Sequence, residues 1–158
     1  MRHFNRQPGL NLPLTLLYCR AACLPDDYHD QDLTSLLASR RPFIIGWGST
    51  STGGGAQDSL REAQVPMVSQ ATCASAYSAI SRVTIGQDKL CAGDGTRDTC
   101  NGDSGGALLS NVLTNTWAVI GVTSFGVDCA RPDFPGVYTR YLSEFSQNYM
   151  ESQKHKYF

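Results

Sequence analysis

The chain has 158 residues, of which 41% are hydrophobic and 9% aromatic, and its 13 basic and 14 acidic side chains leave a net charge of −1. This length and composition are typical of one globular domain with an apolar core. The charge balance argues against binding to nucleic acid or to an anionic membrane surface. No apolar run approaches the roughly 18 to 20 residues that a membrane-spanning helix needs.

Met1–Ala22 has a charged start and a short apolar run, Leu10–Cys19, which are features of a secretory signal peptide. Asn11, Pro13 and Thr15 interrupt that run. We therefore expect a segment that does not belong to the domain, with a signal peptide as the alternative.

The acidic and polar segment Asp26–Arg41 predicts a solvated loop. Its four aspartates raise the alternative of a calcium site, but they lack the glycine and the distal glutamate of a calcium-binding loop. We therefore expect no metal site there and no cofactor in the chain.

Short apolar or alternating stretches separated by turn residues predict β-strands along the rest of the chain. The expected strands are Phe43–Trp47, Leu60–Val68, Lys89–Ala92, Ala107–Leu109, Trp117–Phe125 and Gly136–Thr139. Between them, Ser49–Gln57 predicts an exposed turn and Ser69–Tyr77 a short helix. Several short strands with no long helix between them favour an all-β barrel or sandwich.

The end of the chain has a different periodicity. Four apolar residues recur there at helical spacing and predict a closing amphipathic helix: Leu142, Phe145, Tyr149 and Met150.

Six cysteines indicate structural disulfides rather than metal or redox chemistry. No two of them form a C-x-x-C pair, and none of the three histidines adjoins one. Because disulfides persist in oxidising compartments, we expect a secreted or extracellular protein.

The stretch Asp98–Gly106 reads D-T-C-N-G-D-S-G-G and carries the strongest functional signal. Small residues around Ser104 let the backbone turn tightly and expose the hydroxyl. The amides of Gly102 and Ser104 could then face one position, where a tetrahedral intermediate needs donors for its oxyanion. This is the chemistry of an acyl-transfer nucleophile.

With Cys100 and Asp98 before it, G-D-S-G-G resembles the active-site segment of trypsin-like serine proteases. Further strings occur in the order of that family: A-C-L-P at 22–25, G-W-G at 46–48, K-L-C-A-G at 89–93, and T-S-F-G at 123–126 with P-G-V-Y-T at 135–139. In loop style the chain looks most similar to arthropod clip-domain proteases.

The resemblance implies an all-β fold: the second six-stranded antiparallel Greek-key barrel of the chymotrypsin-like fold, with a C-terminal helix and with the first barrel absent. It implies two parts of the chain, a non-matching segment over residues 1–22 and the C-terminal barrel of a trypsin-like peptidase domain over residues 23–158.

The same comparison implies a pocket for the substrate side chain on which cleavage depends. Asp98 matches the pocket floor in trypsin-like members, where a buried carboxylate would pair with arginine or lysine. Gly126 and Gly136 would leave the pocket open, while Ser124 and Phe125 would lie beside the substrate backbone. The resemblance therefore implies endopeptidase cleavage after Arg or Lys in a protein or peptide. Without the surrounding motifs, Asp98 would read as a turn residue in a polar loop.

Asp103 matches the residue that in this family pairs with a newly freed N-terminus after zymogen cleavage. No I-V-G-G-like terminus exists in this sequence, so the resemblance implies a zymogen-like resting conformation.

The cysteines also follow the family. The resemblance implies the bridges Cys73–Cys91 and Cys100–Cys129, and both positions of a third bridge are lost together, at Pro42 and Ser110. Cys23 matches a cysteine that links to a light chain or pro-region. Cys19 matches nothing in the family, and a strained Cys19–Cys23 bridge is the less favoured alternative.

A serine nucleophile needs a base held by a carboxylate, and the family's A-A-H-C and D-I-A-L-like motifs do not occur in this sequence. We expect His3, His29 and His155 to be solvated rather than catalytic. The preferred hypothesis is thus a fragment of a secreted trypsin-like endopeptidase, inactive alone because it lacks the histidine and aspartate of the triad. Two alternatives stay open: a non-catalytic binding module, or a chain that complements a separate first barrel through Cys23.

Overall fold

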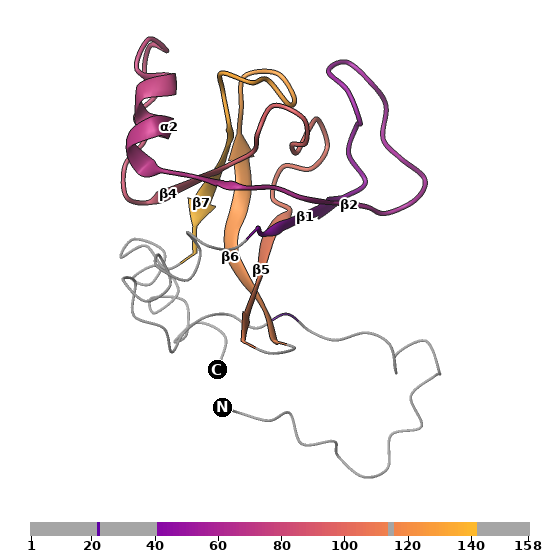
Figure 1. The fold of residues 1–158 in the computed structure, drawn as a ribbon. Helices are drawn as coiled ribbons and strands as arrows, with labels where there is room; N and C mark the ends of the chain where they lie inside the picture. The colour runs from indigo at the N-terminus through magenta and orange to yellow at the C-terminus, as the bar shows by residue number, and fades with distance from the viewer. Residues whose placement is uncertain (1–21, 23–40, 114–115, 142–158) are drawn as a thin grey trace, which may run out of the picture.

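The computed structural model describes residues 22, 41–113 and 116–141. These residues form one antiparallel sheet of seven strands in the order β2-β1-β5-β6-β7-β4-β3, with a single described helix, α2. The bounds are β1 Phe43–Gly46, β2 Arg61–Gln64, β3 Met67–Val68, α2 Gln70–Tyr77, β4 Lys89–Ala92, β5 Ala107–Leu113, β6 Thr116–Phe125 and β7 Gly136–Arg140. Figure 1 shows the sheet curled, with α2 at one end.

The sheet closes because its two edge strands, β2 and β3, are consecutive in the chain and separated only by Val65 and Pro66. The amide of Val65 donates to the carbonyl of Pro42 at 2.9 Å, beside β1. The carbonyl of Pro66 accepts from the amide of Gly93 at 2.9 Å, beside β4. The two edges of the sheet are therefore joined by one bent segment, which makes the sheet a barrel.

The single strand expected over Leu60–Val68 is wrong in detail, because it is interrupted at Val65–Pro66. Proline has no amide hydrogen to give to a strand ladder, so the pairing changes partner there. With β2 and β3 counted as the halves of one bent strand, the all-β, six-stranded antiparallel barrel of the chymotrypsin-like fold is confirmed. The closing helix expected from Leu142 onward lies outside the described residues.

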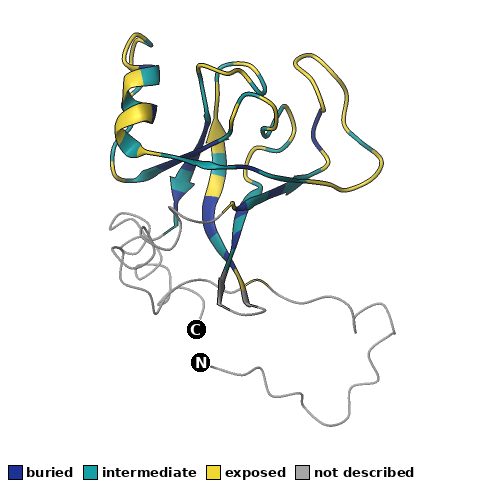
Figure 2. Cartoon of the chain, viewed as in Figure 1, coloured by how far each residue is buried: buried dark blue, intermediate teal, exposed yellow. Residues whose placement is uncertain are grey.

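Two clusters of buried side chains hold the barrel together. The larger fills its interior and includes Ile44, Leu108, Ile120 and Tyr138. The smaller lies under α2 and contains Cys73, Tyr77, Cys91 and Val137. Figure 2 shows buried strand segments and a long connection between β1 and β2 that is mostly exposed, as expected for Ser49–Gln57.

Helix α2 begins after Ser69, whose hydroxyl oxygen accepts the amide hydrogen of Thr72 at 3.1 Å and so caps the first turn. The disulfide Cys73–Cys91 joins α2 to β4, and Cys100–Cys129 joins the loop before β5 to the loop after β6. These are the two pairs that the resemblance implies. On the chain-entropy account each is worth about 3 to 4 kcal/mol.

Ser110 on β5 is buried, and its hydroxyl has no hydrogen-bond partner among the described residues. A buried hydroxyl that leaves water without gaining a partner lowers stability. We predict that Ser110→Ala raises the free energy of unfolding by about 1 kcal/mol in urea titrations. As the opposite control, Ser69→Ala removes the helix cap and is expected to lower it by about 1 kcal/mol. A loss of stability in Ser110→Ala would show that the hydroxyl has a partner.

Candidate active site

The segment that carries Ser104 is a series of tight turns fixed to the barrel. Asp103 donates its amide hydrogen to the carbonyl of Cys100 at 3.0 Å, and Gly106 donates to the carbonyl of Asp103 at 2.9 Å. Gly102 and Gly105 have φ angles of +98° and +82°, a left-handed conformation that favours glycine. The sequence G-D-S-G-G therefore folds this way for steric reasons, and the turns leave Ser104 exposed.

Thr123 on β6 clamps the C-terminal side of this segment. Its carbonyl accepts from the amide of Gly105 at 3.0 Å, and its amide donates to the carbonyl of Gly106 at 2.8 Å. The residues next to Ser104 are thereby tied to a central strand of the sheet. The amides of Gly102 and Ser104 make no hydrogen bond in the described part of the chain, so both remain available as donors.

Beside Ser104 lies a cavity of about 320 Å³, which we call the Ser104 cavity. The resemblance named six residues in and around a substrate pocket, and the structure brings all of them to the lining of this cavity: Asp98, Ser104, Ser124, Phe125, Gly126 and Gly136. Thr123, from the T-S-F-G string, lines it as well, whereas Thr52 and Asp128 also line it and were not predicted. No sequence pattern marks them, because they reach the cavity through the folding of separate loops.

The carboxylate of Asp98 is partly buried in the wall of this cavity. Its Oδ1 accepts from the amide of Thr99 at 2.8 Å and its Oδ2 from the amide of Ala130 at 3.1 Å. Burial raises the pKa of Asp98, although these amides favour the charged form. Asp98 is therefore a fixed carboxylate that would gain from a cationic partner.

The charge of Asp98 contributes to the raised pKa of two nearby tyrosines. Burial and the nearby Asp98 carboxylate raise the pKa of Tyr77 to about 12, and its hydroxyl donates to the carbonyl of Pro135 at 2.8 Å. Burial also raises the pKa of Tyr138, which is 0% exposed. Both phenols stay neutral at physiological pH.

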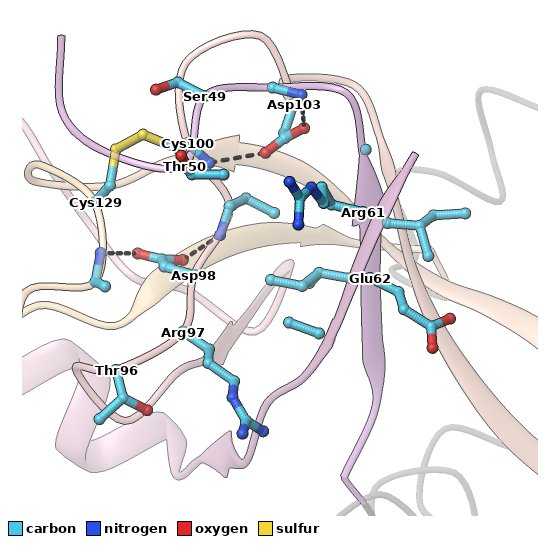
Figure 3. A pocket seen from close by; sticks show the side chains of 17 residues that line it. Ser49, Thr50, Arg61, Glu62, Thr96, Arg97, Asp98, Cys100, Asp103 and Cys129 are labelled. Atoms are coloured by element: carbon cyan, nitrogen blue, oxygen red, sulfur yellow. Dashed lines mark hydrogen bonds between the residues drawn. A yellow bond between two sulfur atoms is a disulfide. The ribbon is translucent and has the colours of Figure 1, made fainter. Parts of the chain in front are cut away.

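Asp103 faces away from the Ser104 cavity. Its Oδ1 accepts from the amide of Gly48 at 2.8 Å and its Oδ2 from the amide of Cys100 at 3.0 Å. It lines a second cavity of about 270 Å³, the Asp103 cavity, shown in Figure 3. Asp98 lines both cavities, so the segment 98–100 is the wall between them.

Other predicted residues lie outside the described part of the chain: Cys19, Cys23, His3, His29 and His155. The aspartates of 26–41 lie there too. Among the described residues, no three or more His, Cys, Asp or Glu side chains gather as metal ligands. No helix in the described ranges is long and apolar enough to cross a membrane.

The structure thus brings the exposed Ser104, on its glycine-rich turn, and the carboxylate of Asp98 to one cavity of a β-barrel. Comparison with known proteins gives the family. The profile of the Trypsin family matches residues 16–146, and the chain belongs to that family.

Individual relatives agree with this assignment. The chain is 45% identical over 111 residues to the proclotting enzyme of Tachypleus tridentatus, which covers 69% of this chain and 29% of that protein. It is 41% identical over 133 residues to the venom protease of Bombus pensylvanicus, covering 81% of this chain and 51% of that protein. It is 42% identical over 104 residues to trypsin-1 of Astacus astacus, covering 65% and 42%. The chain thus spans about half of these relatives or less.

Gly136 is required for the position of Asp98. A Cβ at Gly136 would lie 2.4 Å from Oδ1 of Asp98 and 3.2 Å from the hydroxyl of Tyr138. We predict that Gly136→Ala lowers the free energy of unfolding by about 1 to 3 kcal/mol, because the two amides that hold Asp98 resist its displacement. Thermal unfolding measures this. Gly55→Ala is the control, since its Cβ meets nothing within 4 Å. Equal stability of the two variants would contradict a fixed Asp98.

Proposed function

We propose that this chain carries the nucleophile and the specificity pocket of a trypsin-like serine endopeptidase that cleaves after arginine or lysine. The observation that supports this most directly is the partly buried Asp98 in the same cavity as the exposed Ser104. A guanidinium or ammonium group that enters the cavity would pair with Asp98. The scissile carbonyl of such a substrate would then come to rest near Ser104.

In the proposed reaction, Oγ of Ser104 attacks the scissile carbonyl carbon and gives its proton to a histidine base, which an aspartate orients. The amides of Gly102 and Ser104 would stabilise the oxyanion that forms. Collapse of the tetrahedral intermediate releases the amine, which takes the proton back, and water then hydrolyses the acyl-enzyme.

We propose that this chain by itself does not complete that reaction. The described residues include no histidine, and the printed sequence lacks the A-A-H-C string that carries the base in the family. Asp103 would act by pairing with a cationic group. In the family, that cationic group is a freed N-terminus. We further propose residues 23–158 as the barrel domain and residues 1–22 as a segment outside it.

Two disulfides among the described residues support a secreted or extracellular location. Cys23 is a proposed link to a light chain. A disulfide-linked partner would appear as a larger species on non-reducing electrophoresis of native material that disappears on reduction. Its absence would count against the link alone.

The first test is the affinity of the 158-residue chain for benzamidine, a monocation that would pair with Asp98. We predict binding in titration calorimetry and a loss of about 2 kcal/mol or more in Asp98→Asn. Asp128→Asn, which removes an exposed carboxylate of the same cavity, is the matched control and should keep most of the affinity. No benzamidine binding by the parent chain would overturn the proposed specificity.

The second test is the reactivity of Ser104 toward a fluorophosphonate, with Ser104→Ala as the control for labelling elsewhere. We predict no prompt labelling, because the hydroxyl has no base to activate it. Prompt labelling at Ser104 would mean that the chain supplies a base.

Benzamidine binding without labelling is also what a binding module would give. Restored hydrolysis of an arginyl peptide after addition of a first barrel separates the two functions.

The pH dependence of benzamidine affinity follows from the pKa of Asp98. Burial raises this pKa in the folded chain. Protonated Asp98 therefore contributes to the stability of the ligand-free fold at low pH, and this contribution is lost as the pH rises through the folded pKa. Benzamidine needs the charged form. We predict that its affinity falls as the pH drops through the Asp98 pKa, at a pH above the titration of an exposed aspartate. Affinity independent of pH from 7 down to 4 would contradict this.

A further inference from the structure

Asp103 occupies a space that only glycine leaves free. A Cβ on Gly46 would lie 1.9 Å from Oδ1 of Asp103, and a Cβ on Gly48 would lie 2.5 Å from it. No side chain is tolerated at either position while Asp103 stays in place. The carboxylate is therefore seated at the end of β1, on the side to which a residue at position 46 would point.

The strand pairing sends the side chain of Arg61 to that same side. Gly46 and Arg61 lie directly opposite each other in the antiparallel pair of β1 and β2. Side chains of directly opposite residues share a face, with Cβ atoms about 4.5 to 5.5 Å apart. Arg61 therefore starts on the face where Asp103 lies, and its long side chain can span the remaining distance.

Figure 3 shows this arrangement in the Asp103 cavity. Arg61 extends from β2 into the cavity, while Glu62, the next residue of the strand, points away from Asp103. Successive strand residues point to opposite faces, which explains the difference.

The charges in the cavity leave Asp103 without a cation at contact distance. In the described ranges, the two ion pairs join Lys89 to Asp88 and Arg131 to Asp128, and neither includes Asp103. The other arginine of the cavity, Arg97, donates to the carbonyl of Gln64 at 3.4 Å. The side chain of Arg61 makes no ion pair or hydrogen bond with the described residues, so its guanidinium is available.

We propose that Arg61 is a positioning residue, an in-chain cation that pairs with Asp103. Each carboxylate oxygen of Asp103 accepts one amide hydrogen, so lone pairs remain for the N–H groups of a guanidinium. Rotation about the side-chain bonds of Arg61 brings the guanidinium to the carboxylate. The pair holds the turn between Cys100 and Ser104 in place without a freed N-terminus.

The effect of this pair on ligand binding rests on the proposed function, whereas the pair itself does not. Asp103 is separated from Ser104 by one peptide bond, and the segment 98–100 is the wall shared by both cavities. An ordered Asp103 therefore stabilises the wall that carries Asp98, and Arg61 becomes a determinant of affinity for basic ligands through that wall.

The pair is tested directly by a double-mutant cycle in urea unfolding of the full 158-residue chain. We expect Arg61→Gln to lower the urea midpoint in the parent chain but not in an Asp103→Asn background, where the guanidinium has no carboxylate to pair with. Arg61→Lys keeps the charge and should keep most of the parent midpoint. Arg97→Gln, which removes another arginine of the same cavity, is the matched control and should show no coupling to Asp103→Asn. Equal effects of Arg61→Gln in both backgrounds, or equal coupling for Arg97→Gln, would overturn the proposal.

The consequence for the site is tested by benzamidine affinity of the same variants. We expect Arg61→Gln to weaken binding about fivefold, with recovery to within twofold in Arg61→Lys and no change in Arg97→Gln. If unfolding shows that Arg61 is coupled to Asp103 but no variant binds benzamidine, the ion pair stands and the proposed function fails. If benzamidine binds equally to all variants, Arg61 has no positioning role, while the proposed function stands.

Discussion

The carboxylate of Asp103 joins the two segments on which the geometry of the site depends. It accepts amide hydrogens from Gly48, just after β1, and from Cys100, at the start of the turn that carries Ser104. Hydrogen bonds to a charged group contribute about 1.5 to 3 kcal/mol each, so these two contacts outweigh most neutral contacts in the neighbouring loops. Beside these two contacts, the amide of Ser49 donates to the carbonyl of Asn101 at 2.8 Å.

Strand β6 holds the other side of the turn that carries Ser104. Thr123 bonds to Gly105 and Gly106, so the turn is held on one side by a carboxylate and on the other by a strand. The disulfide Cys100–Cys129 then ties the same turn to the loop that donates an amide to Asp98. Ser104 thus lies between fixed points, which is the rigidity that an oxyanion site with backbone donors requires.

Much of this organisation could be predicted from the sequence. Strands, the capped helix at Ser69 and the turn at Gly102 follow from local chemistry, because alternation, capping and positive φ angles are properties of neighbouring residues. The interruption at Pro66 was also a local signal, yet the barrel closure that depends on it involves pairing with both β1 and β4. That long-range partnership leaves no mark in the sequence around it.

The residues of the candidate site also divide into those that a sequence motif marks and those that only long-range contacts bring to the site. Asp98 and Ser104 lie in one motif, and Ser124, Phe125, Gly126 and Gly136 lie in strings that the resemblance recognised. Thr52 reaches the Ser104 cavity through a bond from the amide of Cys129 to its hydroxyl at 3.3 Å, across 77 positions of sequence. Arg61 reaches the Asp103 cavity only because β2 pairs with β1 in one register. A shift of one residue would turn its side chain to the other face.

Two carboxylates held by backbone amides on either side of one short wall create a physical link between the cavities. On the proposal for Arg61, a cation at Asp103 supports the segment that also carries Asp98. By linkage, a cation that pairs with Asp103 and thereby strengthens binding at Asp98 must itself be held more tightly when a basic group occupies Asp98. In the proposed role of Arg61, the position of Asp103 depends on the register in which β2 pairs with β1, and the geometry of the site depends on it too.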